Sequence, residues 1–255
     1  MSIIFGVLEE GLVYAIMALG VYITYKILDF PDLSVDGTFP LGGALTATLL
    51  LAGMNPFVAL ILSFALGCLA GCVTGIIHVK LKVRDLLSGI IVMTALYSVN
   101  LRLAGKANVS FFNTDSIFEN NLMNRLIPSG FSDIRVIIIL AVIVLAVKLL
   151  LDLYLKTRSG YLLRAVGDNE TLVTSLAKDK GSVKILGLAI ANGLAALAGS
   201  VYCQQKGFFE ISMGTGTIVI GLANVIIGTK LFKRFGAVKA TTAVVIGSII
   251  YKACV

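Results

Sequence analysis

Long apolar runs, separated by short polar or charged segments, dominate this sequence. Several runs approach or exceed the roughly 18 apolar residues that are typical of a transmembrane helix. We therefore predict an all-α, polytopic membrane protein of about eight spans, built as a single transmembrane domain over residues 1–255. The predicted spans are residues 11–28, 38–53, 56–78, 86–104, 134–155, 183–203, 211–229 and 236–255.

The stretch between the first two apolar runs, DFPDLSVDGTFPLGGAL at residues 29–45, combines three carboxylates with two prolines. Pro31 and Pro40 disfavour helical geometry at the residue before them, and Gly37 permits a tight bend. As a helix, residues 38–53 are about 24 Å long at 1.5 Å per residue, shorter than the hydrocarbon core of about 30 Å. We therefore predict a broken early helix, with part of this stretch dipping into the membrane.

The polar side chains at this break are candidates for structural and transport roles. Ser34 or Asp36 is expected to cap the helix that restarts. Asp32 and Asp36 are expected to accept hydrogen bonds from orphan backbone amides and to pair with basic residues of neighbouring helices. Irregular backbone at membrane depth occurs where it is buried in protein or faces a water-filled cavity. The predicted residues of the break and pathway are Asp32, Ser34, Asp36 and Gly37.

The composition agrees with a membrane protein. The chain is 58% hydrophobic and 14% charged, with a mean hydropathy of +0.97, whereas soluble domains are about 45–50% apolar. The net charge is +7, and the basic residues gather after the third, fifth and seventh predicted spans. The positive-inside bias places those loops in the cytoplasm and the loop at residues 105–133 outside. We therefore expect contact with a lipid bilayer and no binding of nucleic acid.

Small and polar residues within the predicted spans indicate packing and pathway roles. Gly67, Gly71 and Gly75 recur on one face of the third span, where small residues allow close approach of another helix. Polar residues on apolar helices face the bundle interior, so they line a pathway or form hydrogen bonds between helices. The candidates are Thr94, Ser98, Asn100, Asn192, Thr217 and Asn224.

The sequence signatures of common catalytic and metal sites are absent. There is no GxxxxGK[ST] phosphate loop, no GxSxG nucleophile elbow and no HExxH zinc motif. The four cysteines form no CxxC pair, and His78 is the only histidine. We therefore predict a transport subunit and not an enzyme, with no catalytic residues, no metal and no cofactor bound by this chain.

Residues 158–182 are too polar to cross a membrane, yet their apolar residues recur at helical spacing. This pattern is typical of an amphipathic helix or helix pair on the cytoplasmic face, and a solvated interfacial loop fits the periodicity equally well. Gly167, Asp168 and Asn169 are expected to break the helix, with Asp168 or Asn169 as the N-cap of its second half.

Two motifs resemble a known family. The run RAVGDNE at residues 164–170, followed by LAALAG at 194–199, resembles the coupling region of permease subunits of bacterial ATP-binding cassette (ABC) importers, in the family of branched-chain amino acid and ribose permeases. The run DLSVDG at residues 32–37 is similar to the DLSVG motif of ribose-type permeases. The NFAHG motif of branched-chain permeases is absent, and SVDGTF is similar to permeases associated with tryptophan and tyrosine uptake in Gram-positive bacteria.

This resemblance implies a homodimer or pseudo-dimer of permease subunits in the bacterial cytoplasmic membrane. The implied partners are an ATPase dimer that binds ATP and Mg²⁺ and an extracellular or periplasmic substrate-binding protein. The implied substrate is a small polar nutrient, either an amino acid, with aromatic ones as candidates, or a sugar or nucleoside, moved inward by alternating access. The residues assigned to the ATPase contact are Arg164, Gly167, Asp168, Asn169 and Glu170.

An ion-coupled secondary transporter is the alternative that the residues leave open. In that case, Asp32 and Asp36 in the broken helix would couple an ion gradient to uptake. Co-purification of an ATPase and a binding protein would favour the importer, and their absence would favour the alternative.

Overall fold

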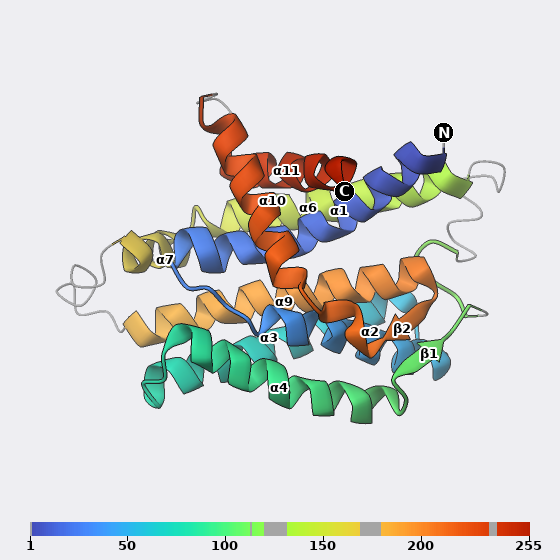
Figure 1. The fold of residues 1–255 in the computed structure, drawn as a ribbon, viewed down its shortest axis with the longest axis horizontal. Coiled ribbons are helices and arrows are strands. Elements are labelled where there is room, and N and C mark those ends of the chain that lie inside the picture. Colours follow the sequence, from blue (N-terminus) through green and yellow to red (C-terminus); the bar gives the residue numbers. More distant parts are fainter. Residues whose placement is uncertain (1, 113, 120–131, 169–179, 235–238) are drawn as a thin grey trace.

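The computed structural model describes residues 2–112, 114–119, 132–168, 180–234 and 239–255. Long helices lie side by side along the horizontal direction of Figure 1, and α10 crosses them steeply. Along the chain, the helices are α1 (Ser2–Val21), the π-helix η1 (Tyr22–Ile27), α2 (Val35–Leu51), α3 (Pro56–Lys80), α4 (Asp85–Ala104), α6 (Ser132–Tyr154), α7 (Arg158–Asp168), α9 (Lys180–Lys206), the 3₁₀ helix η3 (Ile211–Gly214), α10 (Thr217–Leu231), the 3₁₀ helix η4 (Phe232–Arg234) and α11 (Ala240–Cys254).

The helices confirm the prediction of an all-α, polytopic membrane protein. Within the described residues, six helical segments are long and apolar enough to cross a membrane: Ile4–Ile27, Pro56–Lys80, Asp85–Ala104, Ile134–Tyr154, Lys180–Lys206 and Ile211–Leu231. Two shorter apolar helices, α2 and α11, occupy the second and last predicted spans. The boundaries differ most at α1, which begins at Ser2 and not near residue 11.

Helix α9 lies at the centre of the bundle and packs against α3, α2 and α1. The α3 glycines lie on the face that meets α9: a Cβ atom on Gly71 would be 2.3 Å from the Leu188 carbonyl oxygen, and one on Gly67 would be 2.6 Å from that of Asn192. Gly75 meets the backbone of Ile185 in the same way. Because α3 and α9 are in backbone contact there, the glycines serve helix packing within this subunit.

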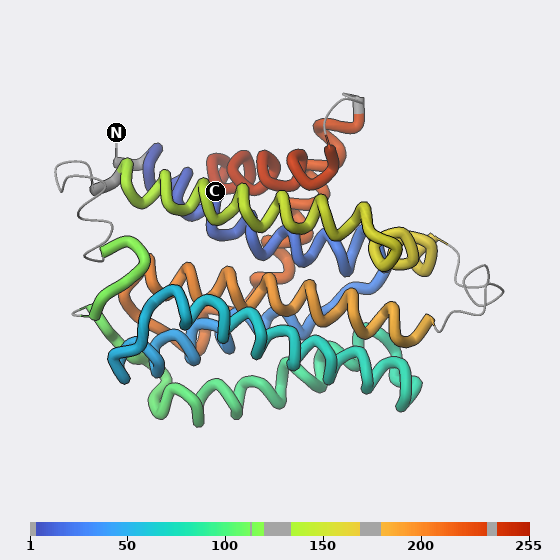
Figure 2. The backbone as a smooth tube through the Cα atoms, turned by 180° about the vertical axis from the view of Figure 1, so that it is seen from behind, coloured from blue at the N-terminus to red at the C-terminus, as the bar shows by residue number. Residues whose placement is uncertain are grey.

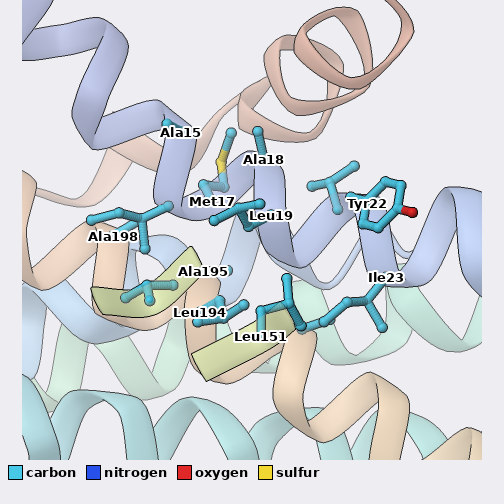
Figure 3. Close-up of a cluster of buried hydrophobic side chains, with 14 of the residues drawn as sticks. Ala15, Met17, Ala18, Leu19, Tyr22, Ile23, Leu151, Leu194, Ala195 and Ala198 are labelled. Atoms are coloured by element: carbon cyan, nitrogen blue, oxygen red, sulfur yellow. The ribbon is translucent and has the colours of Figure 1, made fainter. Parts of the chain in front are cut away.

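The largest apolar cluster joins α1, α6 and α9, as Figure 3 shows. Small side chains of α1 and α9 let these helices approach, and larger ones fill the remaining space. The labelled members are Ala15, Met17, Ala18, Leu19, Tyr22, Ile23, Leu151, Leu194, Ala195 and Ala198.

The two ends of the bundle differ in charge and secondary structure (Figures 1 and 2). At one end, near the N-terminus, two short antiparallel strands pair: β1 (Asn108–Ser110) and β2 (Phe208–Glu210), with Val109 opposite Phe209. The other end carries α7 and the junction between α3 and α4. We name it the basic end because Lys80, Lys82, Arg84, Lys156 and Arg158 lie there. The strands were not predicted, because three residues are too few to show an alternating pattern.

The break in the early helix lies between η1 and α2, at residues 28–34. Phe30 is buried, and Asp29 has a left-handed backbone with a φ of 52°. Of the residues predicted to encode the break, Gly37, Phe39 and Pro40 do not interrupt the helix, because all three lie inside α2.

Proline is tolerated inside α2 because the helix contacts a neighbour where its hydrogen bonding is interrupted. Pro40 has no N–H to donate to the carbonyl of Asp36, four residues earlier. Gly214 of η3 packs at that point: a Cβ there would lie 2.1 Å from the Asp36 carbonyl oxygen and 2.5 Å from Pro40 Cδ. Only a glycine allows η3 to cover this gap so closely.

Candidate functional site

Asp32 connects the break to the middle of α9. Its Oδ1 accepts hydrogen bonds from the backbone N–H of Ser34 at 2.9 Å and the Ser34 hydroxyl at 2.6 Å. Its Oδ2 accepts one from Asn192 Nδ2 at 2.7 Å. Asn192 Oδ1 in turn accepts from the hydroxyls of Ser34, at 3.1 Å, and Thr38, at 2.8 Å. All four residues are fully buried, so this network fixes an irregular backbone segment inside the bundle.

Asp36 caps a helix other than its own. Its Oδ2 accepts a hydrogen bond from the Gly216 N–H at 3.0 Å, and its Oδ1 accepts from the Ile218 N–H at 2.7 Å and the Thr217 hydroxyl at 2.9 Å. These groups form the N-terminus of α10, where orphan amides favour an anionic acceptor. Asp36 therefore joins the start of α2 to the start of α10.

Two expectations for the polar residues of the break were wrong: the cap of α2 and the ion pairs of the carboxylates. Ser34 occupies the N-cap position of α2 but makes no capping hydrogen bond, because its hydroxyl is engaged by Asp32 and Asn192. Neither Asp32 nor Asp36 forms an ion pair within the part of the chain that the structure describes. Backbone amides and neutral side chains satisfy both carboxylates instead.

Asp36→Ala is expected to lower the free energy of unfolding by about 1–2 kcal/mol, the usual cost of losing a helix cap. The Gly216 and Ile218 amides would lose their acceptor. The matched control is Asp85→Ala, which removes a first-turn acid of α4 that forms no hydrogen bond through its side chain among the described residues. Thermal unfolding of the detergent-solubilised protein checks this, and equal midpoints for the two variants would contradict the capping role.

A pocket of about 280 Å³ lies beside the break, between α2, α4 and the η3–α10 connection. Asn100 is buried in its wall and donates from Nδ2 to the Gly37 carbonyl at 3.0 Å, while its Oδ1 has no hydrogen-bond partner among the described residues. The lining residues are Asp36, Gly37, Pro40, Met93, Thr94, Tyr97, Asn100, Ile211 and Thr215. A largely apolar pocket with a few polar groups suits a small ligand that has both kinds of surface.

The predicted pathway residues differ in where the structure places them. Thr94 and Asn100 line the pocket, whereas Asn192 and Thr217 are hydrogen-bonded to the carboxylates of Asp32 and Asp36. Ser98 is exposed on α4. Asn224 is fully buried in α10, and its side chain has no hydrogen-bond partner among the described residues.

Sequence reasoning did not select Met93, Tyr97 and Thr215 for this pocket. On α4, the lining residues 93, 94, 97 and 100 recur at helical spacing. That periodicity around Thr94 and Asn100 was the signal that could have identified Met93 and Tyr97. Thr215 had no such signal, because contacts with distant residues of α2, the cap by Asp36 and the packing of Gly214 on Pro40, bring this connection to the pocket.

Helix α7 contains the first part of the predicted coupling segment. Arg164 and Asp168 are exposed on it, whereas Leu163 and Val166 are buried against the bundle. Gly167 lies inside α7, so the expected break does not begin there. A Cβ on Gly167 would be 1.7 Å from the Ile27 carbonyl oxygen, so the glycine allows α7 to touch the end of η1. Asn169 and Glu170 lie outside the described residues.

Across the described ranges, no group of three His, Cys, Asp or Glu side chains is arranged to hold a metal ion. His78 packs edge-on against Phe30, with 4.9 Å between ring centroids, and its Nδ1 lies 2.9 Å from the Val83 carbonyl oxygen. Because Phe30 lies in the break, these contacts indicate that His78 packs against the break and stabilises it.

Comparisons with known proteins identify relatives over nearly the whole chain. A family model described as "Branched-chain amino acid transport system / permease component" matches residues 3–254. The chain is 48% identical to a tyrosine transport system permease protein of Clostridioides difficile, over 99% of this chain and 81% of that protein. It is 35% identical to an uncharacterized protein of Rickettsia prowazekii, over 98% of this chain and 87% of that protein. It is 28% identical to the ribose import permease of Escherichia coli, over 88% of this chain and 68% of that permease. No solved structure gave a significant match.

Proposed function

The chain belongs to the family of branched-chain amino acid transport system permease components, as a permease subunit of an ABC transporter, and we propose that it imports an aromatic amino acid, with tyrosine as the first candidate. The observation that carries this proposal is the 48% identity, over 99% of the chain, to a tyrosine transport system permease protein. The 28% identity to a ribose permease makes sugar the weaker candidate.

The pocket beside the break supports a path for such a substrate. An amino acid needs an acceptor for its ammonium group, and Asn100 Oδ1, which has no hydrogen-bond partner among the described residues, offers one in the same pocket wall as the Asp36 carboxylate. Met93, Pro40 and the ring of Tyr97 offer apolar surface to an aromatic side chain. We assign this pocket to one wall of the path, with a second permease subunit supplying the opposite wall.

The proposed orientation places the basic end in the cytoplasm of a bacterial cell. This assignment rests on the positive-inside bias of the loops. A dimer of ATPase subunits would then contact α7 and the segment that follows it, and a substrate-binding protein would deliver the amino acid at the end that carries β1 and β2. ATP binds the closed ATPase dimer more tightly than the open one, and this difference drives the permease between its two states.

Contacts of α7 support its role in transmitting this movement. Leu163 is buried and would lie 2.7 Å from a Cβ atom on Gly187 of α9, and Gly167 touches η1. A displacement of α7 therefore acts directly on α9 and on the segment that leads into the break. Helix α9 carries Asn192 of the network around Asp32, and η1 leads into the segment that carries Asp32 itself.

Reconstitution tests the proposed function. The chain is placed in liposomes with the ATPase and the binding protein encoded beside it, and uptake of labelled tyrosine is measured with and without ATP. We expect accumulation that requires ATP, is unaffected by dissipating Na⁺ and H⁺ gradients, and is reduced by excess phenylalanine or tryptophan. Uptake that follows an ion gradient without ATP would establish the secondary transporter instead, and competition by ribose alone would overturn the substrate assignment.

A further inference from the structure

A second polar pocket, of about 320 Å³, lies at the basic end, away from the helix break. It is formed where α6 ends, α7 begins and α11 starts, and Tyr22 of η1 lines it as well. The residues around it are Tyr22, Asp152, Leu155, Lys156, Tyr161, Arg164, Lys239, Ala240 and Thr241. Of these residues, only Arg164 has a role in the proposed function, as part of the ATPase contact, so the other charges of the pocket need another explanation.

The pocket has an excess of positive charge that its own carboxylate does not neutralise. Asp152 is already engaged: its carboxylate lies 3.1 Å from Lys148 Nζ and 3.4 Å from Lys239 Nζ, and it accepts a hydrogen bond from the Thr241 hydroxyl at 2.6 Å. The side chains of Lys156 and Arg164 form no hydrogen bond or ion pair with any described residue. Two cations are therefore available to a bound anion.

Helix α11 directs its N-terminus at the same pocket. Its N-cap residue, Lys239, makes no capping hydrogen bond through its side chain, so the first amides of the helix are open to a ligand. Such amides favour anions, phosphates above all. Tyr22 also lines the pocket: only 7% of it is exposed, and its hydroxyl makes no hydrogen bond among the described residues. Figure 3 shows this hydroxyl directed away from the apolar cluster.

An apolar groove lies next to this pocket, on the other side of the Lys148–Asp152 ion pair. It has a volume of about 210 Å³ and lies between α1, α6 and α11. Lys148 joins the two, because it lines the groove and its Nζ pairs with Asp152 in the pocket. The other lining residues are Leu12, Ala141, Val144, Leu145, Thr242 and Val245. Only an anion with an apolar chain attached would occupy both spaces at once.

From this arrangement, we propose that the pocket and groove bind an anionic phospholipid of the cytoplasmic leaflet. The phosphate lies among Lys156, Arg164 and the first amides of α11, and one acyl chain lies along Leu145 and Val245. Basic pockets between helices on the cytoplasmic side are the usual sites of such headgroups. Because Arg164 belongs to α7 and Thr241 to α11, the lipid links the proposed coupling helix to the membrane helix α11.

Native mass spectrometry of the full chain, released from detergent, tests this site with phosphatidylglycerol and phosphatidylcholine as probes. We expect one phosphatidylglycerol to be retained at least 10-fold more tightly than phosphatidylcholine. We also expect that preference to disappear in the double variant Lys156→Gln and Arg164→Gln. The control is Lys80→Gln with Lys82→Gln, which removes the same charge at the basic end outside the pocket and should keep the preference.

A second variant and a competitor keep the test decisive. Leu145→Trp fills the groove without changing charge and should weaken phosphatidylglycerol binding, and it replaces the double variant if that protein does not fold. Excess inorganic phosphate should not displace the lipid. Equal binding of the two lipids, retained preference in the Lys156 and Arg164 variant, or full displacement by inorganic phosphate would each overturn the proposal.

Discussion

Asp32→Ala is expected to abolish transport, whereas Asp32→Asn should retain a measurable part of it. The alanine variant leaves the Ser34 amide buried without an acceptor, and Asn192 Nδ2 keeps only the Leu188 carbonyl oxygen, at 3.1 Å. At about 1–3 kcal/mol for the unsatisfied amide and about 0.5–1.5 kcal/mol for the lost hydrogen bond, the break is destabilised by about 1.5–4.5 kcal/mol. The asparagine variant keeps one carbonyl oxygen, and Asn192 can turn its amide over toward the hydroxyls of Ser34 and Thr38, which both donate and accept. The turned amide loses its hydrogen bond to the Leu188 carbonyl, so part of the stability is lost.

This pair of variants separates a hydrogen-bonding role from a charge-coupling role. If Asp32 carried a coupling ion, loss of its charge would matter and Asp32→Asn would be as inactive as Asp32→Ala. ATP-dependent uptake and the thermal unfolding midpoint should both rank wild type, asparagine and alanine in that order. An inactive asparagine variant with a wild-type unfolding midpoint would contradict the structural role.

Gly167→Ala is expected to reduce transport at least 10-fold while the permease remains in the membrane. The added Cβ would lie 1.7 Å from the Ile27 carbonyl oxygen, so α7 must move away from η1. A backbone carbonyl cannot yield as a flexible side chain does, and packed interiors transmit such a shift. Uptake and the stimulation of ATP hydrolysis by the binding protein should therefore fall together.

The matched control for this variant is Gly6→Ala in α1, where the added Cβ meets no atom within 4 Å. The amount of each variant in the membrane is measured by immunoblot, and binding of the ATPase by co-purification. Normal uptake by Gly167→Ala at normal abundance would show that contact between α7 and η1 is not needed for coupling.

The spans were predictable because each of them is a long apolar run, and the glycine face of α3 was visible as a repeat of four residues. The path of the backbone within the break was not. Pro40 predicts an interruption by local rules alone, but η3, about 175 residues later in the chain, packs over its missing hydrogen bond. The effect of a distant element on a local preference cannot be read from the residues beside Pro40.

The candidate site was predictable in its residue types and less so in its pairings. Asp32, Ser34, Asp36 and Asn192 were all selected from sequence as polar groups in apolar surroundings. The sequence did not predict that Asp36 caps α10 and not its own helix, because the pairing joins residues about 180 positions apart. Likewise, nothing local indicated that Asn192 would bond to Asp32 across 160 residues.

The central claim is that the pocket beside the break lines the substrate path. It is tested most directly by the rate at which Thr94→Cys reacts with a small charged thiol reagent in the reconstituted transporter. The background variant has Cys68, Cys72, Cys203 and Cys254 replaced by alanine, and the control is Val99→Cys, on another exposed face of α4. Labelling at Thr94 is expected to change at least several-fold between ATP-free and ATP-bound states and to slow with tyrosine-loaded binding protein, while labelling at Val99 does not respond. Equal labelling of Thr94→Cys in every state would contradict this claim.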